Sequence, residues 1–141
     1  MYCVGMGCER GCPQSHLEAL LHTCLKQAGI SIDDVHSINS LDLKADEIGL
    51  LALAQSLQKP FQTWSAEVLR PLTSRLHSPS QYVFNTVGVY GVAESSALYA
   101  ADKLLASVLH GENASNPRSE LIVTKQKTAK ATCAIAVALL R

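Results

Sequence analysis

The first 64 residues alternate between short apolar runs and longer amphipathic stretches. Residues 2–6 form a short apolar run that predicts a buried strand. Over residues 17–28 the apolar positions recur at helical spacing, and Gly29 follows where a left-handed helix end is expected. The spacing of Ser15 and Glu18 predicts that Ser15 caps this helix. The chain therefore opens as a strand followed by a helix.

The same alternation continues through residue 64. Residues 35–41 read as a second strand, and residues 50–57 carry the buried stripe of a second helix. Asp46 is the expected N-cap of that helix, with Glu47 as an acid in its first turn. Residues 61–64 predict a third strand. Strands separated by helices in this way indicate parallel β-α-β units with right-handed crossovers.

The middle of the chain is mainly helical. Ser65 is placed to cap a short helical turn, and residues 78–87 open a helix on a serine–proline pair. A long alanine-rich helix is expected from about residue 93 to residue 109. Residues 112–119 follow as a polar loop with an asparagine–proline pair, which we expect to be the most mobile stretch.

Two apolar runs end the chain, over residues 121–124 and 131–139. Their connection is too short for a parallel crossover, so they predict an antiparallel pair. The expected fold is a single α/β domain over residues 1–141. Its sheet is mixed, with about five strands, and helices flank it.

Composition narrows the class of protein. The chain has 141 residues, of which 48% are hydrophobic and 17% charged, which indicates one packed domain and excludes disorder. The formal net charge is zero, so no general field attracts nucleic acid or an anionic membrane. No apolar run approaches the roughly 20 residues of a membrane span. With five cysteines and no secretory signal pattern, we expect a reduced, cytoplasmic protein.

The charges are nevertheless distributed unevenly along the chain. Residues 1–60 hold seven acids against four bases, whereas residues 118–141 hold five bases against one acid. This asymmetry predicts a basic patch contributed by the C-terminal segment. The bases of that segment are Arg118, Lys125, Lys127, Lys130 and Arg141.

A glycine-rich segment follows the first strand and is the first candidate site. Ligands of open α/β sheets bind beyond the carboxyl ends of the strands, and glycine turns can present backbone N–H groups to an anion. Arg10 stands where a dinucleotide fingerprint needs its third glycine, which counts against a nucleotide cofactor. The alternative is a turn that only lets the helix pack. The candidate ligand-binding residues here are Gly5, Gly7, Cys8, Arg10 and Gly11.

Two further loops offer polar side chains. Ser40, Asp42 and Lys44 follow the second strand, and a surface ion pair between Asp42 and Lys44 is the simpler reading. Lys125 and Lys127 are two residues apart at a strand end, so they share a face and are candidate ligands for an anion. The alternative for this pair is a solvated hairpin tip.

Three other groups of residues are candidates for chemistry. Glu94 is a candidate general acid or base together with Asp42, or else a favourable charge in the first turn of its helix. Cys8 is a candidate nucleophile if a helix N-terminus lowers the pKa of its thiol. Cys8, Cys12 and His16 lie four residues apart, but no second ligand pair completes a structural zinc site. We expect neither a bound metal nor a cofactor.

Four segments of the chain also resemble, in order and spacing, the CobE/CbiG C-terminal domain family of cobalamin biosynthesis. The resemblance covers essentially the whole chain, and the second segment is its most specific part. The segments are Gly5–Gly11, Ser40–Leu50, Gly91–Glu94 and Lys125–Lys127 with Thr132–Ala136.

The resemblance implies an α/β domain that acts on precorrin or corrinoid intermediates, which carry acetate and propionate carboxylates around a flat apolar ring. Larger family members contain a second part and open a lactone on cobalt-precorrin-5A, releasing acetaldehyde. This chain resembles the freestanding form. Three roles stay open: binding or handling the intermediate, hydrolysing a precorrin lactone or carbon–carbon bond, and completing a site together with another cobalamin-pathway enzyme.

Overall fold

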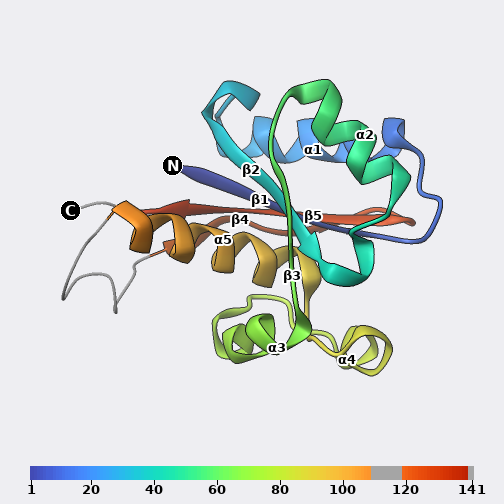
Figure 1. Ribbon diagram of the computed structural model, residues 1–141, viewed down its shortest axis with the longest axis vertical. Coiled ribbons are helices and arrows are strands. Elements are labelled where there is room, and N and C mark those ends of the chain that lie inside the picture. The colour runs from blue at the N-terminus through green and yellow to red at the C-terminus, as the bar shows by residue number, and fades with distance from the viewer. Residues whose placement is uncertain (109–118, 140–141) are drawn as a thin grey trace.

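The computed structural model describes residues 1–108 and 119–139. Its centre is a five-stranded mixed sheet in the order β3-β2-β1-β5-β4, with helices on both faces (Figure 1). The predicted α/β class is confirmed. The strands are β1 (Tyr2–Cys8), β2 (Val35–Leu41), β3 (Phe61–Trp64), β4 (Ser119–Lys127) and β5 (Ala131–Ala138).

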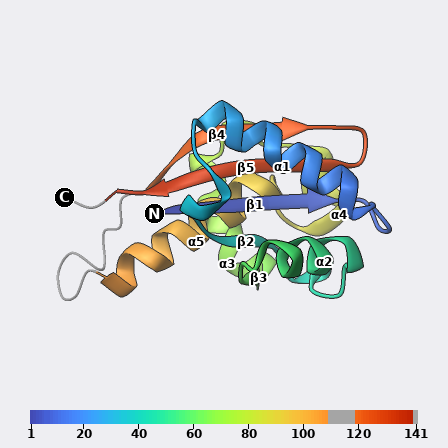
Figure 2. The ribbon, with the colours of Figure 1, turned by 90° about the horizontal axis from the view of Figure 1, so that it is seen from above.

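The parallel half of the sheet arises from the alternation at the start of the chain. β1 pairs in parallel with β2, and β2 with β3, as the strand–helix pattern predicts. The crossover helices cover one face of the sheet, which Figure 2 shows from above. The segments that connect these strands are α1 (Gln14–Ala28), η1 (Ile32–Asp34), η2 (Asp42–Lys44) and α2 (Ile48–Leu57).

The C-terminal hairpin completes the sheet. β4 and β5 are antiparallel, as predicted, and β5 also pairs antiparallel with β1. β5 is therefore an interior strand, which explains why most of its residues are apolar and buried.

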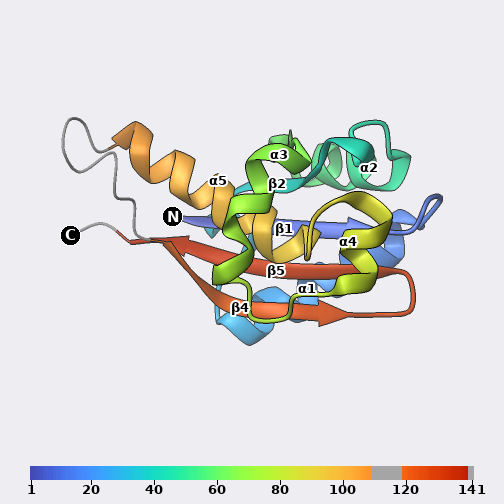
Figure 3. The ribbon, with the colours of Figure 1, turned by 90° about the horizontal axis from the view of Figure 1, so that it is seen from below.

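A second helical layer covers the other face (Figure 3). α5 (Val92–Val108) lies across β1 and β5, and three shorter elements lie beside it. The sheet thus separates two apolar clusters, one beneath α1 and α2 and one beneath α5. The shorter elements are α3 (Ala66–Leu69), η3 (Arg70–Arg75) and α4 (Gln81–Val87).

The predicted glycine turn after a strand ending at Met6 is wrong. β1 continues to Cys8, so Gly5 and Gly7 are buried strand residues. A Cβ on Gly5 would lie 1.9 Å from the Ala93 carbonyl oxygen, so Gly5 lets α5 lie directly on the strand. Of the segment's glycines, Gly11 alone has a positive φ, of 78°.

Helix starts also differ from the prediction by one or two residues. α1 begins at Gln14 with Pro13 at its N-cap, so Ser15 lies inside the helix. The chain enters α1 in the extended conformation that the proline ring allows, and the Pro13 carbonyl accepts from His16 and Leu17. Glu47, not Asp46, occupies the N-cap position of α2. The left-handed end at Gly29 and the Ser65 cap are confirmed.

Later element boundaries shift in the same way. α4 is capped by Ser80 rather than opening at residue 78. The polar loop predicted over residues 112–119 lies, apart from its last residue, outside the described part, as do two bases of the C-terminal patch, Arg118 and Arg141. In the described ranges, no helix combines the length and apolarity needed to cross a membrane.

Candidate functional site

The carboxyl ends of β1, β2 and β3 meet at one edge of the sheet, where ligands of open α/β sheets bind. The turn between β4 and β5 joins the same edge, because the Glu9 amide donates to the Lys130 carbonyl at 2.9 Å. We call residues 8–13, 42–49 and 125–131 the carboxyl edge. It lies at the right of Figure 1.

Arg10 ties the first two loops of the carboxyl edge together. Its guanidinium donates to Asp46 Oδ1 at 2.8 Å, to Glu47 Oε1 at 3.3 Å and to the Leu43 carbonyl at 2.5 Å. Glu47 is 3% exposed, and its second oxygen accepts from the Gly11 amide at 3.0 Å. The hydrogen bond from Arg10 holds the pKa of Asp46 below its usual value. Arg10 is therefore already matched by carboxylates.

A hollow of about 470 Å³ opens between the starts of α1 and α2. Neither helix start has a side-chain cap. However, the carboxylates of Asp46 and Glu47 line this hollow together with Arg10, so negative charge already faces the helix N-termini. The hollow is consequently a poor cradle for a further anion.

Cys8 lacks the properties of an activated nucleophile. It is the last residue of β1, half-buried, and α1 begins six residues later. Burial, reinforced by the negative charge of Glu47, raises the pKa of its thiol to about 11. The expectation of a lowered pKa is wrong because burial and a nearby acid outweigh the opposing charges of Lys44 and Arg10. Arg10 donates to the carbonyl of Leu43, so the neighbouring Lys44 belongs to the loop that is tied to the end of β1.

Glu94 is buried and fully engaged. Its side chain is 1% exposed, Oε1 accepts from the Ser78 amide at 2.9 Å, and Oε2 accepts from the Lys125 amide at 2.9 Å. Lys125 Nζ donates to the Ser78 carbonyl at 3.3 Å. The carboxylate thus joins α5 to β4 and to the segment that precedes α4. This geometry favours a structural role over proton transfer.

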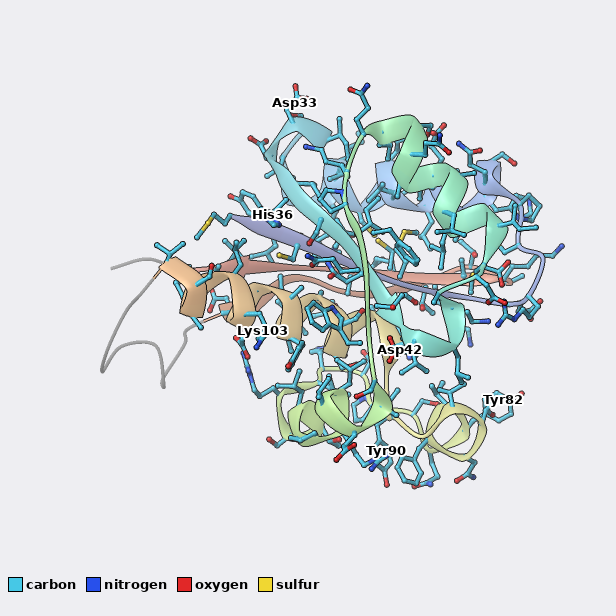
Figure 4. The ribbon with its side chains drawn as sticks, viewed as in Figure 1. Asp33, His36, Asp42, Tyr82, Tyr90 and Lys103 are labelled. Carbon is cyan, nitrogen blue, oxygen red and sulfur yellow. The ribbon has the colours of Figure 1, made fainter. Side chains whose placement is uncertain are left out.

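The remaining candidates differ in accessibility. Asp42 is exposed at the start of η2, and Figure 4 shows its side chain close to the β3 ribbon. Lys44 is half-buried and Lys127 is exposed at the end of β4. Ser40 is fully buried, and among the described side chains its hydroxyl alone is buried without a hydrogen-bond partner. Ser40 contacts no solvent, so a ligand reaches it only after a local opening.

The structure brings Cys8, Arg10 and Lys44 together at the end of β1. Lys125 lies instead on the α5 face, beside Glu94 and the start of α4. The sequence pattern missed α4 itself as part of this region. The available signal was the presence of four apolar residues, three of them consecutive, in a seven-residue helix (QYVFNTV).

Residues 2–136 match the family model described as Cobalamin synthesis G C-terminus. The chain belongs to the cobalamin synthesis G C-terminus family. The resemblance noted from the four segments is confirmed, and the chain is a cobalamin-biosynthesis protein.

The relatives of this chain match it over different shares of their own length. Protein CobE of a Sinorhizobium species is 36% identical over 133 residues, which are 94% of this chain and 77% of the relative. The cobalt-precorrin-5A hydrolase of Priestia megaterium is 33% identical over 95 residues, 67% of this chain. That match spans only 25% of the hydrolase.

A solved structure agrees with the sheet order and layers described above. The crystal structure of CobE, a protein from the cobalamin (vitamin B12) biosynthetic pathway, superimposes with a TM-score of 0.86 at 34% identity. It covers 99% of this chain and 91% of the CobE chain.

Proposed function

We propose that the protein binds a polycarboxylate precorrin or corrinoid intermediate at the carboxyl edge. One observation carries the proposal: the lysines of this edge are not neutralised. Among the described residues, ion pairs form at Arg10 and Arg75, and no lysine takes part in one. Lys44 and Lys127 therefore present charge from two different elements of the same edge.

The chemistry of the ligand class fits such an arrangement. Precorrins carry several carboxylates around their ring, so separate lysines can hold separate groups. Each exposed ion pair contributes only about 0.2–1 kcal/mol, which means that useful affinity requires several contacts at once. In this proposal Lys44, Lys125 and Lys127 contact carboxylates, while Arg10 holds the η2 loop in place through Leu43 and Asp46.

Titration with hydrogenobyrinic acid, followed by visible absorbance, tests this proposal. We expect the Lys44→Gln, Lys127→Gln double variant to raise Kd about tenfold, because two ion pairs with ligand carboxylates are lost. Lys26→Gln, at the exposed end of α1 on the opposite edge, makes a single-charge control and should leave Kd unchanged. No spectral change at tens of micromolar, or an equal effect of Lys26→Gln, would contradict the proposal.

A second candidate function is hydrolysis of a cobalt-precorrin-5A-type lactone, alone or with a partner subunit. The hydrolase relative favours it, as does the exposed Asp42 two residues from Lys44. In that case Asp42 is the acid or base and Lys44 stabilises the oxyanion. Acetaldehyde release from cobalt-precorrin-5A measures this activity, and Asp42→Asn should abolish it. If the protein binds the intermediate but releases no acetaldehyde, either by itself or with other pathway enzymes present, the hydrolase function is contradicted and only the binding function remains.

A further inference from the structure

α4 is an apolar helix that the fold covers only in part. Four of its seven residues are apolar, yet none of the seven is buried. Tyr82 is 80% exposed, far beyond what a large aromatic side chain usually shows. Val83, Phe84 and Val87 are half-buried, so Tyr82 is the one apolar side chain that α4 turns fully to solvent.

The helix is nevertheless well formed, so its exposure does not reflect fraying. The Ser80 hydroxyl accepts from the Val83 amide, and the helix ends at Gly88 with a left-handed φ of 84°. Behind the helix, the rings of Phe84 and Tyr90 stack with centroids 4.4 Å apart. α4 therefore presents Tyr82 on a defined support.

The support is anchored to the carboxyl edge. Ser78, two residues before the α4 cap, is held by Glu94 and by the ammonium of Lys125. Figures 1 and 3 both place α4 at the end of the sheet that carries the strand carboxyl ends. In Figure 4 Tyr82 projects outward from α4 on that same side of the molecule as Asp42.

Several exposed large hydrophobic side chains lie at this end of the molecule, those of α2 on the face of the sheet opposite α4. Of the seven such residues in the described ranges, four belong to η2, α2 and α4, and Ile122 lies on β4. Met1 and Val108, by contrast, lie at the opposite end, where β1 starts and α5 finishes. The four residues are Leu43, Ile48, Leu51 and Tyr82.

We propose that α4 is the apolar wall against which the flat face of the tetrapyrrole ring packs, with Tyr82 as its principal contact. This inference rests on the proposed binding function. It assigns a protein contact to the ring face, which the lysines do not hold. The tetrapyrrole is chosen as the ligand because it complements both the apolar surface of α4 and the charge of the nearby lysines. A ring with a carboxylate rim presents an apolar face to α4 while its rim reaches Lys125 and Lys127, whereas a wholly apolar partner would leave those lysines unmatched.

The test separates ring contact from carboxylate contact by using two ligands. Hydrogenobyrinic acid has both features, and butane-1,2,3,4-tetracarboxylate has carboxylates without a ring. We expect Tyr82→Ala to raise Kd for hydrogenobyrinic acid about tenfold and to leave Kd for the tetracarboxylate unchanged. Tyr82→Phe should retain the affinity, because the ring face is kept. Gln81→Ala, an exposed neighbour on α4, is the control and should behave as wild type.

The results of these titrations distinguish this inference from the proposed binding function on which it rests. Suppose that wild type binds hydrogenobyrinic acid and that the lysine variant lowers the affinity, whereas Tyr82→Ala does not. The proposed contact between α4 and the ring is then wrong, and the proposed binding function is still supported. If wild type does not bind, both fail. A wild-type dimer that Tyr82→Ala dissociates, with unchanged ligand affinity, would assign α4 to contact between copies and overturn the inference.

Discussion

At the residue scale, Glu94 shows how tertiary contacts decide the role of an acid. Its position in the first turn of α5 suggested either catalysis or a helix-start charge. Both carboxylate oxygens instead accept backbone amides from segments 16 and 31 residues away in sequence. Neither partner is visible in the local pattern, so the sequence alone cannot assign this role. The same holds for Arg10, whose carboxylate partners lie 36 and 37 residues away.

Glu94→Gln should lower the free energy of unfolding by about 1–3 kcal/mol, since one of the two buried amides loses its acceptor and faces an amide donor instead. Urea unfolding measures this change. Glu120→Gln, an exposed site on β4, removes the same charge and should shift the stability by less than about 0.5 kcal/mol. Equal urea midpoints for Glu94→Gln and wild type would show that the two hydrogen bonds accepted by Glu94 contribute nothing to stability.

Cys8 should react slowly with iodoacetamide despite being the one half-buried thiol among five free cysteines. Burial raises its pKa to about 11, so little thiolate exists at pH 8, and labelling should run on the order of a hundredfold slower than for an unperturbed thiol. Because Lys44 lowers this pKa, Lys44→Gln should slow labelling further. Peptide mass spectrometry locates the label. Rapid labelling at pH 8, or acceleration by Lys44→Gln, would refute this prediction.

At the element scale, the contact between β1 and α5 depends on Gly5. A Cβ there would lie 1.9 Å from the Ala93 oxygen and 2.8 Å from the Ala97 nitrogen, and backbone atoms cannot rotate away. Gly5→Ala should therefore destabilise the fold by at least about 3 kcal/mol. Gly11→Ala is the comparison, because its φ is positive but no atom lies within 4 Å. It should lose only about 1 kcal/mol, and similar urea midpoints for the two variants would contradict the packing role.

Elements whose stability is local could be predicted, and elements that depend on distant contacts could not. The third strand at residues 61–64 and the left-handed end at Gly29 follow from nearby residues and are confirmed. β1 was predicted too short, because Gly5 and Gly7 suggested a turn. They are tolerated in a strand since α5 and Thr132 occupy the space of their missing side chains. The sequence predicts α4 as a helix but not its exposure, because exposure depends on which distant segments pack against it.

At the scale of the whole molecule, the two faces of the sheet differ in how firmly they hold their elements. α1 contributes five buried residues to its core and α5 contributes nine, whereas α4 contributes none. Around α4, Ser78 is held by Glu94 and Lys125, and the Gly88 carbonyl accepts from Arg70. The molecule thus combines a firmly packed sheet with one less deeply anchored helix beside its carboxyl edge.

Hydrogen exchange tests this division and the proposed site together. Without ligand, α4 amides should exchange faster than those of α1 and α5, because opening α4 exposes no buried side chain. Saturating hydrogenobyrinic acid should slow exchange in residues 42–47, 78–91 and 125–131, while residues 29–36 at the opposite edge stay unchanged. In Tyr82→Ala the slowing at 78–91 should be lost but that at 42–47 kept, because the lysines still hold the rim. Uniform slowing along the chain would mean that the ligand stabilises the fold without contacting α4.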